Sequence, residues 1–188
     1  MKWKIIIPIA VVALIVAGGI AMSQAPSPAT PASQASSSAT TGDVLPVTTN
    51  PISNTSTTPG LTIVSAAAED NVDPISGAAI TDRLQITLGN TTKKPLTHVE
   101  TYYEMTDITT GATEAYYLAL DGLTLAPNAE TTISFDTETG VGHYPENPYS
   151  LYRSSTNQVD FTIQVSVDGV QIAKGTATKG AGTGEQAD

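Results

Sequence analysis

Histidine and cysteine, the side chains best suited to nucleophilic and acid–base chemistry, are scarce in this chain. It has no cysteine and two histidines, His98 and His143. The absence of cysteine excludes disulfides, thiolate zinc sites and thiol catalysis. The sequence also has no His-x-x-x-His spacing, no Gly-x-Ser-x-Gly motif and no glycine-rich phosphate loop. We therefore expect a protein that is not an enzyme and needs no cofactor.

Two acidic segments offer the oxygen ligands that hard cations prefer. One contains Asp70 and Asp73, and the other contains Asp136 and Glu138 and resembles the start of a calcium loop. Neither segment completes a calcium loop. The segment with Asp136 and Glu138 lacks the bidentate acid expected further along. Solvated turns rich in Asp and Asn explain both segments without an ion, so we expect no metal site.

The segment from residue 140 to residue 155 is the best candidate for a binding site. It belongs to a connection of about 20 residues, and ordered connections of that length tend to be functional. Its tyrosines offer amphipathic contact area at low entropy cost. The alternative is a crossover that packs over the open end of the core and has no partner. The candidate contact residues are His143, Tyr144, Tyr149, Tyr152 and Arg153.

The N-terminus has the features of a membrane anchor. An unbroken apolar run at residues 5–22 follows Lys2 and Lys4, and about 18 helical residues span roughly 27 Å, close to the thickness of a thin bilayer. The basic flank predicts that the chain after the run lies outside the cell. We expect residues 1–22 to form a single transmembrane helix; the alternative is a cleaved signal sequence and a secreted protein.

Residues 23–60 are dominated by Ser, Thr, Ala and Pro and carry a single charge. Such a composition buries too little apolar surface to offset the entropy of ordering, so we predict a disordered stalk. Sequons for N-glycosylation begin at Asn54 and Asn90. Residues 180–188 are polar and rich in glycine, and we expect a flexible tail.

The charge is strongly negative beyond the apolar run. The chain has 18 acidic and 8 basic residues. Two of the basic residues, Lys2 and Lys4, precede the run, so the remainder carries a net charge of about −12. This charge argues against nucleic acid and against anionic lipid as partners.

Residues 61–179 alternate apolar and polar side chains and show little helical periodicity. A turn dipeptide, Asp168-Gly169, predicts a type I′ hairpin turn between the last two strands. Seven short antiparallel strands predict an all-β fold, an immunoglobulin-like or fibronectin-III-like sandwich. The expected strands are residues 61–67, 83–89, 96–106, 114–120, 130–135, 159–167 and 171–178.

The run from Leu84 to Leu96 is a strand that ends in Asn and a polar turn, and the next strand carries aromatic residues. This order resembles FxLYD-type small secreted sandwich domains. The later Leu-Ala-Pro-Asn-Ala-Glu at residues 125–130 is similar to that family's Leu-x-Pro-Gly-Glu entry to a strand. Asn128 replaces the usual Gly, and Asn also tolerates the left-handed conformation. The resemblance covers about half the domain and implies an extracytoplasmic module without a shared catalytic site.

These expectations describe a membrane-anchored module at the cell surface that binds a protein, small molecule or glycan. The alternative is a structural subunit of a surface appendage or envelope layer. Pro26 and Pro28 argue against that alternative, because they would end a helix soon after it leaves the membrane.

Overall fold

The structure is a computed structural model, and it describes residues 44–68 and 84–182. The expected membrane helix, residues 23–43 of the expected stalk, and the candidate ligands Asp70 and Asp73 lie outside the described residues. Within residues 44–68 and 84–182, no helix has both the length and the apolar character needed to cross a bilayer.

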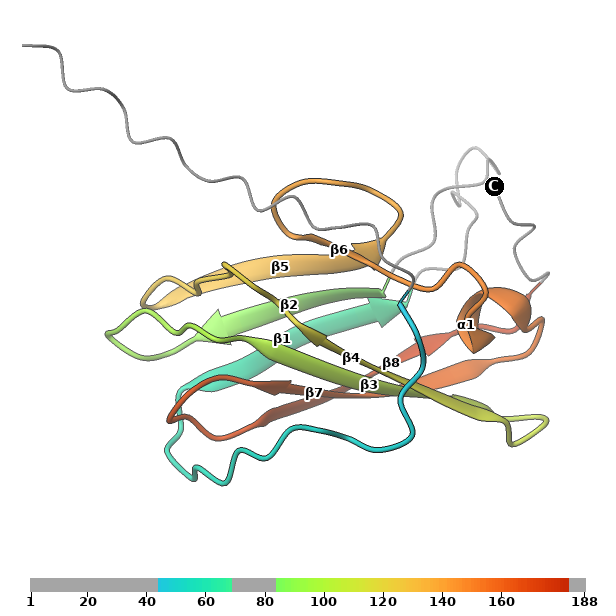
Figure 1. The fold of residues 1–188 in the computed structure, drawn as a ribbon, viewed down its shortest axis with the longest axis horizontal. Helices are drawn as coiled ribbons and strands as arrows, with labels where there is room; N and C mark the ends of the chain where they lie inside the picture. Colours follow the sequence, from blue (N-terminus) through green and yellow to red (C-terminus); the bar gives the residue numbers. More distant parts are fainter. Residues whose placement is uncertain (1–43, 69–83, 183–188) are drawn as a thin grey trace, which may run out of the picture. The chain divides into compact units, whose positions relative to one another are not determined.

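Two four-stranded sheets stack face to face (Figure 1). The first has the order β1-β2-β5-β6 and the second the order β4-β3-β7-β8. A short helix, α1 (Leu151–Ser154), precedes β7. The strands are β1 (Leu61–Ala68), β2 (Leu84–Asn90), β3 (Glu100–Asp107), β4 (Thr113–Ala119), β5 (Ala129–Asp136), β6 (His143–Pro145), β7 (Val159–Ser166) and β8 (Ala173–Lys179).

The predicted β-sandwich is confirmed, but the number of strands is not. The described residues form eight strands rather than seven, and the additional strand is β6. It runs parallel to β5, so the first sheet is not wholly antiparallel. Because β6 has three residues and ends at Pro145, it is too short for alternation of apolar side chains to reveal it.

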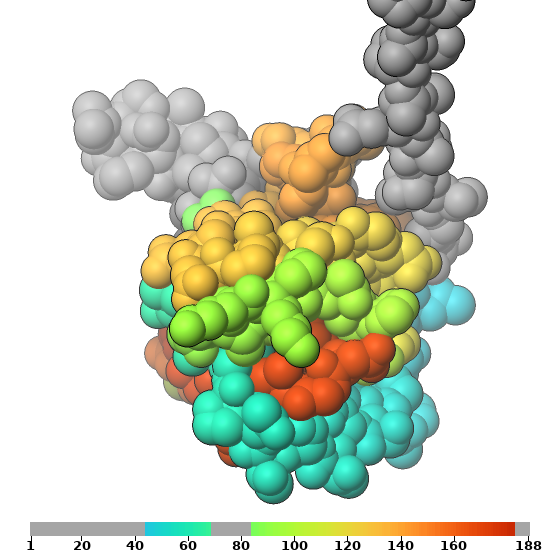
Figure 2. Space-filling model, turned by 90° about the vertical axis from the view of Figure 1, so that its left-hand side faces the viewer, coloured from blue at the N-terminus to red at the C-terminus, as the bar shows by residue number. Residues whose placement is uncertain are grey.

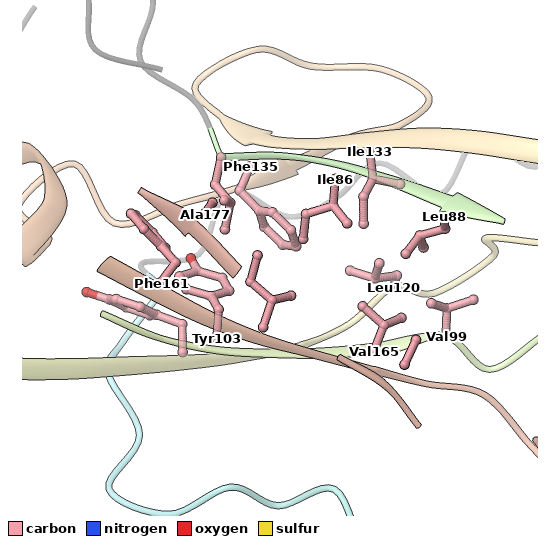
Figure 3. Packing of buried hydrophobic residues seen from close by; sticks show 14 of the residues in the cluster. Ile86, Leu88, Val99, Tyr103, Leu120, Ile133, Phe135, Phe161, Val165 and Ala177 are labelled. Atoms are coloured by element: carbon pink, nitrogen blue, oxygen red, sulfur yellow. The ribbon is translucent and has the colours of Figure 1, made fainter. Parts of the chain in front are cut away.

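Alternation places the core residues as the strand pattern predicts. In β7, Val159, Phe161, Ile163 and Val165 are buried, and the polar residues between them are more exposed. Side chains from the two sheets point toward one another between the layers (Figure 3). Successive side chains point to opposite faces of a strand. The face that carries the apolar side chains packs against the other sheet, and the polar face is turned away from it.

Residues 44–60 belong to the folded domain, so the prediction of a disordered stalk reaching residue 60 is wrong for this part. We call this segment the strap. It runs along the β4-β3-β7-β8 sheet, on the side away from the core (Figure 1, cyan). Its backbone bonds to the domain at both ends: Val47 donates to the Ala115 carbonyl over 2.8 Å, and the Gly60 carbonyl accepts from Thr91 over 2.9 Å.

The strap is ordered by polar contacts rather than by apolar burial, which explains why composition alone misled the prediction. The amide nitrogen of Asn54 donates to the carbonyls of Val167 at 3.0 Å and Val170 at 2.8 Å, and to the hydroxyl of Ser166 at 3.2 Å. The Gly169 carbonyl accepts from the Ser56 hydroxyl at 2.9 Å. The strap therefore satisfies the backbone carbonyls of the β7–β8 turn.

The β7–β8 turn differs from the predicted type. Gly169 has a positive φ of 69°, but among the described non-glycine residues only His98 and Asn128 have positive φ. A type I′ turn needs positive φ at both central residues, so that prediction is wrong. The left-handed conformation expected at Asn128 is confirmed by its φ of 50°.

Replacing Asn54 with alanine is expected to lower the free energy of unfolding by about 1–3 kcal/mol, because buried carbonyls would lose their donor. Asn50→Ala is the matched control, since the Asn50 amide donates to one side chain, Gln164, at 3.2 Å. That control should change the free energy by less than about 1 kcal/mol. Urea denaturation of both variants measures the difference, and equal midpoints would contradict this role of Asn54.

The asparagines of both glycosylation sequons donate hydrogen bonds from their side-chain amides to backbone carbonyls of the domain. The Asn54 contacts are given above, and the amide nitrogen of Asn90 donates to the carbonyls of Lys94 at 2.8 Å and Leu125 at 2.9 Å. Glycosylation attaches a bulky sugar to this same nitrogen. A sugar on either residue would therefore have to displace bonds that hold the strap or the β2–β3 connection.

Candidate functional site

The connection from β5 to α1 is the part of the fold that the sequence analysis singled out. Its first loop, residues 137–142, returns the chain so that β6 pairs in parallel with β5. Parallel neighbours usually need a much longer crossover. The tight return uses Gly140 and Gly142, whose φ angles of 130° and 87° suit glycine. The chain near residue 140 (orange) stands out from the surface of the domain (Figure 2).

Tyr152 and Arg153 are buried, so the prediction that they contribute to an accessible contact surface is wrong. Tyr152 is 2% exposed, and its ring meets Phe161 edge-on with a centroid distance of 5.5 Å. Both residues lie in α1, which covers an end of the core. The alternative prediction, a crossover that packs over the core, is correct for these two residues. The helix turns both of their side chains toward the core.

Arg153 forms a buried ion pair with Glu146, and the two side chains are 6% and 5% exposed. The Arg153 Nε donates to Glu146 Oε1 over 2.6 Å. Close by in the sequence, the amide of Asn147 donates to the Tyr116 hydroxyl over 2.9 Å, and that hydroxyl donates to Glu114. Burial and this bond to Glu114 raise the pKa of Tyr116. The network ties the connection to β4.

Asp107 fixes the far end of the connection, a role that the sequence analysis missed. The buried carboxylate accepts from the Ser155 hydroxyl at 2.7 Å and from the Asn157 amide at 2.9 Å. It also accepts from the backbone of Thr109 and Thr110. The bonds from Ser155 and Asn157 hold the pKa of Asp107 well below its usual range. The Asp-x-x-x-Gly turn sequence at residues 107–111 was the available signal.

The accessible part of the connection is smaller than predicted. Tyr149 is 80% exposed and Val141 is fully exposed. His143 and Tyr144 are partly buried, and the Tyr144 ring lies 6.0 Å from that of Phe135. Burial raises the pKa of Tyr144. Tyr149 itself is oriented by a turn in which its backbone N–H donates to Asn147 Oδ1 at 2.9 Å.

Three residues that the sequence analysis placed in different hypotheses lie together at the β5–β6 return. The Nδ1 atom of His143 lies 2.9 Å from Asp136 Oδ2 and 3.7 Å from Glu138 Oε2. One ligand atom from each residue lies within 4.8 Å of the others. We call these three residues the β5–β6 triad. The spacing Asp-x-Glu followed by His five residues later was the sequence signal that could have joined them.

The other histidine lies in a more open setting. His98 Nδ1 is 2.7 Å from Asp168 Oδ2, and both side chains are more than three-quarters exposed. It precedes β3 in a left-handed conformation with φ of 54°. Solvent screens such an exposed pair, so we expect little stability from it.

Comparison with known proteins gives no family for this chain. No family model matches it, and no curated protein matches it. Among solved structures, the sporulation control protein Spo0M from Bacillus subtilis aligns at 7% identity with a TM-score of 0.35, covering 66% of this chain and 50% of that one. The alkylpurine DNA glycosylase AlkC from Pseudomonas fluorescens, bound to DNA containing an abasic site analogue, aligns at 16% identity with a TM-score of 0.34. The second alignment covers 63% of this chain and 30% of AlkC. The chain therefore spans half or less of these two proteins, and likeness at this level carries no functional argument.

Proposed function

We propose that this chain is a membrane-anchored module that is displayed outside the cell, binds a protein partner and catalyses no reaction. The anchoring rests on the apolar run at residues 5–22 and the basic residues before it. The choice of partner class rests on charge, because a net charge of about −12 beyond that run disfavours nucleic acid.

The observation that carries the binding proposal is the exposure of Val141 and Tyr149 on an ordered connection. Scattered exposed apolar residues are common on protein surfaces. These two differ because the connection that bears them is held by β6 pairing and by the buried Arg153–Glu146 pair. A segment that is already ordered loses less conformational entropy when a partner binds. Tyrosine is also enriched among residues that dominate binding energy.

The non-catalytic part of the proposal rests on the setting of the histidines. Each of the two bonds to a carboxylate, His98 to Asp168 and His143 to Asp136. In the described parts of the chain, neither imidazole hydrogen-bonds to a hydroxyl that could serve as a nucleophile.

We also propose that the β-sandwich is immunoglobulin-like or fibronectin-III-like and that it resembles FxLYD-type domains. The chain crosses from one sheet to the other after β2, after β4 and after β6. Consecutive strands pair antiparallel within a sheet at β1–β2, β3–β4 and β7–β8, whereas β5 and β6 pair in parallel. Greek-key crossings of this kind are typical of that sandwich class. An extracytoplasmic binding role is what the FxLYD resemblance would imply.

The test is chemical cross-linking on intact cells that express the full chain, followed by recovery of the cross-linked partner. A Val141→Ala/Tyr149→Ala variant should recover at least about ten-fold less partner, because loss of one or two contact side chains removes on the order of 1.4 kcal/mol or more. Ile108→Ala is the matched control, since Ile108 is an exposed apolar residue in the β3–β4 turn. Equal recovery with all three chains would refute this contact site.

Two further measurements test the remaining parts of the proposal. The full chain should stay with membranes under alkaline extraction, and protease added to intact cells should remove the domain. Release of the chain into the soluble fraction would contradict the anchor. In detergent the chain should run as a small species. A large homo-oligomer would instead favour the structural subunit of a surface assembly.

A further inference from the structure

We propose that the β5–β6 triad, Asp136, Glu138 and His143, binds one divalent first-row transition metal ion such as Zn²⁺. The site is separate from the proposed partner contact, since neither Val141 nor Tyr149 supplies a ligand. Metal binding at the triad can therefore be tested independently of partner binding.

The distances from His143 to the two carboxylates are close to the spacing of ligands around a single ion. Oxygen and nitrogen ligands lie about 2.0–2.2 Å from Zn²⁺. Ligand atoms that share such an ion are therefore roughly 3.0–3.5 Å apart in octahedral or tetrahedral geometry. The measured separations from His143 Nδ1 are 2.9 Å to Asp136 Oδ2 and 3.7 Å to Glu138 Oε2. The Asp136 and Glu138 ligand atoms lie within 4.8 Å of each other, and the half-exposed Glu138 side chain is free of the burial that would prevent it from closing on an ion.

The backbone holds the triad in this arrangement. Asp136 is the last residue of β5 and His143 is the first of β6. Parallel pairing of Ser134 with His143 and of Asp136 with Pro145 keeps the two strands in register. The backbone N–H of Glu138 donates to Asp136 Oδ1 over 3.0 Å, which turns the loop back toward β5. The three ligands are thus presented by one short, ordered return.

Burial and charge also favour a cation at this position. The Asp136 side chain is 1% exposed, whereas that of Glu138 is 55% exposed, so the triad is closed on one side and open to solvent on the other. Within the described residues, Asp136 and Glu138 each form an ion pair with His143. A buried carboxylate needs compensation of its charge. With a neutral imidazole the triad carries two negative charges, which one divalent ion would balance.

The ligand types select the class of metal. An imidazole nitrogen beside two carboxylates suits Zn²⁺, Mn²⁺, Co²⁺ or Ni²⁺, whereas Ca²⁺ and Mg²⁺ prefer sites made of oxygen alone. Soft ions that seek thiolate ligands have none here, because the chain has no cysteine. Three protein ligands leave at least one position for water or for a group from another molecule.

The test is isothermal titration calorimetry of the purified, tag-free full chain with ZnCl₂. We expect one saturable site with a micromolar or lower dissociation constant. Thermal unfolding in Zn²⁺ at about 100 times that constant should show a midpoint raised by about 5–10 °C. CaCl₂ at millimolar concentration should neither compete with Zn²⁺ nor raise the midpoint.

Variants decide whether the triad holds the ion. His143→Ala and Glu138→Gln should each weaken Zn²⁺ binding at least about ten-fold. Glu138→Gln guards against a folding defect, because this side chain is half exposed. His98→Ala removes the other histidine–carboxylate pair and should bind Zn²⁺ as the native chain does. The proposal is overturned if the native chain shows no saturable site, or if Glu138→Gln binds Zn²⁺ as tightly as the native chain.

Discussion

Replacing Tyr152 with alanine is expected to lower the free energy of unfolding by about 3–5 kcal/mol, the range seen when a large aromatic side chain is removed from a core. Tyr152 is 2% exposed and packs edge-on against Phe161. Its loss would leave a cavity between α1 and the core that neighbouring side chains fill only in part. Urea denaturation followed by circular dichroism measures the change.

Tyr149 provides the matched control, because it is the same residue type three positions earlier in the same connection. Its side chain is 80% exposed. Tyr149→Ala should therefore change the free energy of unfolding by no more than about 0.5 kcal/mol. If both variants lose stability equally, the difference in burial between Tyr152 and Tyr149 is wrong. If neither does, Tyr152 is not a core residue.

Replacing Arg153 with alanine is expected to lower the free energy of unfolding by about 3–5 kcal/mol, the cost typical of removing one partner from a buried ion pair. The Glu146 carboxylate is 5% exposed in the native structure and would lose the guanidinium beside it. The penalty comes from the buried charge that is left behind rather than from the attraction alone. Chemical denaturation at neutral pH measures it.

A double variant separates this explanation from simple loss of packing. Replacing Arg153 with methionine and Glu146 with glutamine removes both charges and keeps most of the side-chain volume. This double variant should recover at least half of the stability lost by Arg153→Ala, because a neutral pair of similar shape avoids burying the carboxylate without its guanidinium. A double variant as unstable as Arg153→Ala would show that the charge on Glu146 is not the cause.

The strands were predictable because each buries one face. Alternation in β7 places Val159, Phe161 and Ile163 inward, and these residues are buried in the structure. The pattern is local, since side chains two positions apart share a face of any strand. For the same reason β6 was missed: three residues that end in proline contain too little alternation to detect.

The strap was not predictable from composition. Composition measures how much apolar surface a segment can bury, and residues 44–60 bury little. Their order comes from the amide of Asn54, whose partners lie more than 110 residues away in the β7–β8 turn. Only the assembled sheet brings the Val167 and Val170 carbonyls to that amide.

Local patterns in the amino-acid sequence were enough to predict the class of fold, the segments that form its seven longer strands, and the connection that carries the candidate contact residues. These properties follow from patterns within a few residues, and such patterns are present in the chain before it folds. The roles of the residues within that connection depend on the folded arrangement of the sheets. It buries Tyr152 and Arg153, leaves Tyr149 exposed, and joins His143 to Asp136 and Glu138. These outcomes depend on which sheet the helix covers and on how β6 pairs with β5. The packing of α1 is set by contacts between residues far apart in the sequence. The pairing of β6 involves a strand too short to recognise from its sequence.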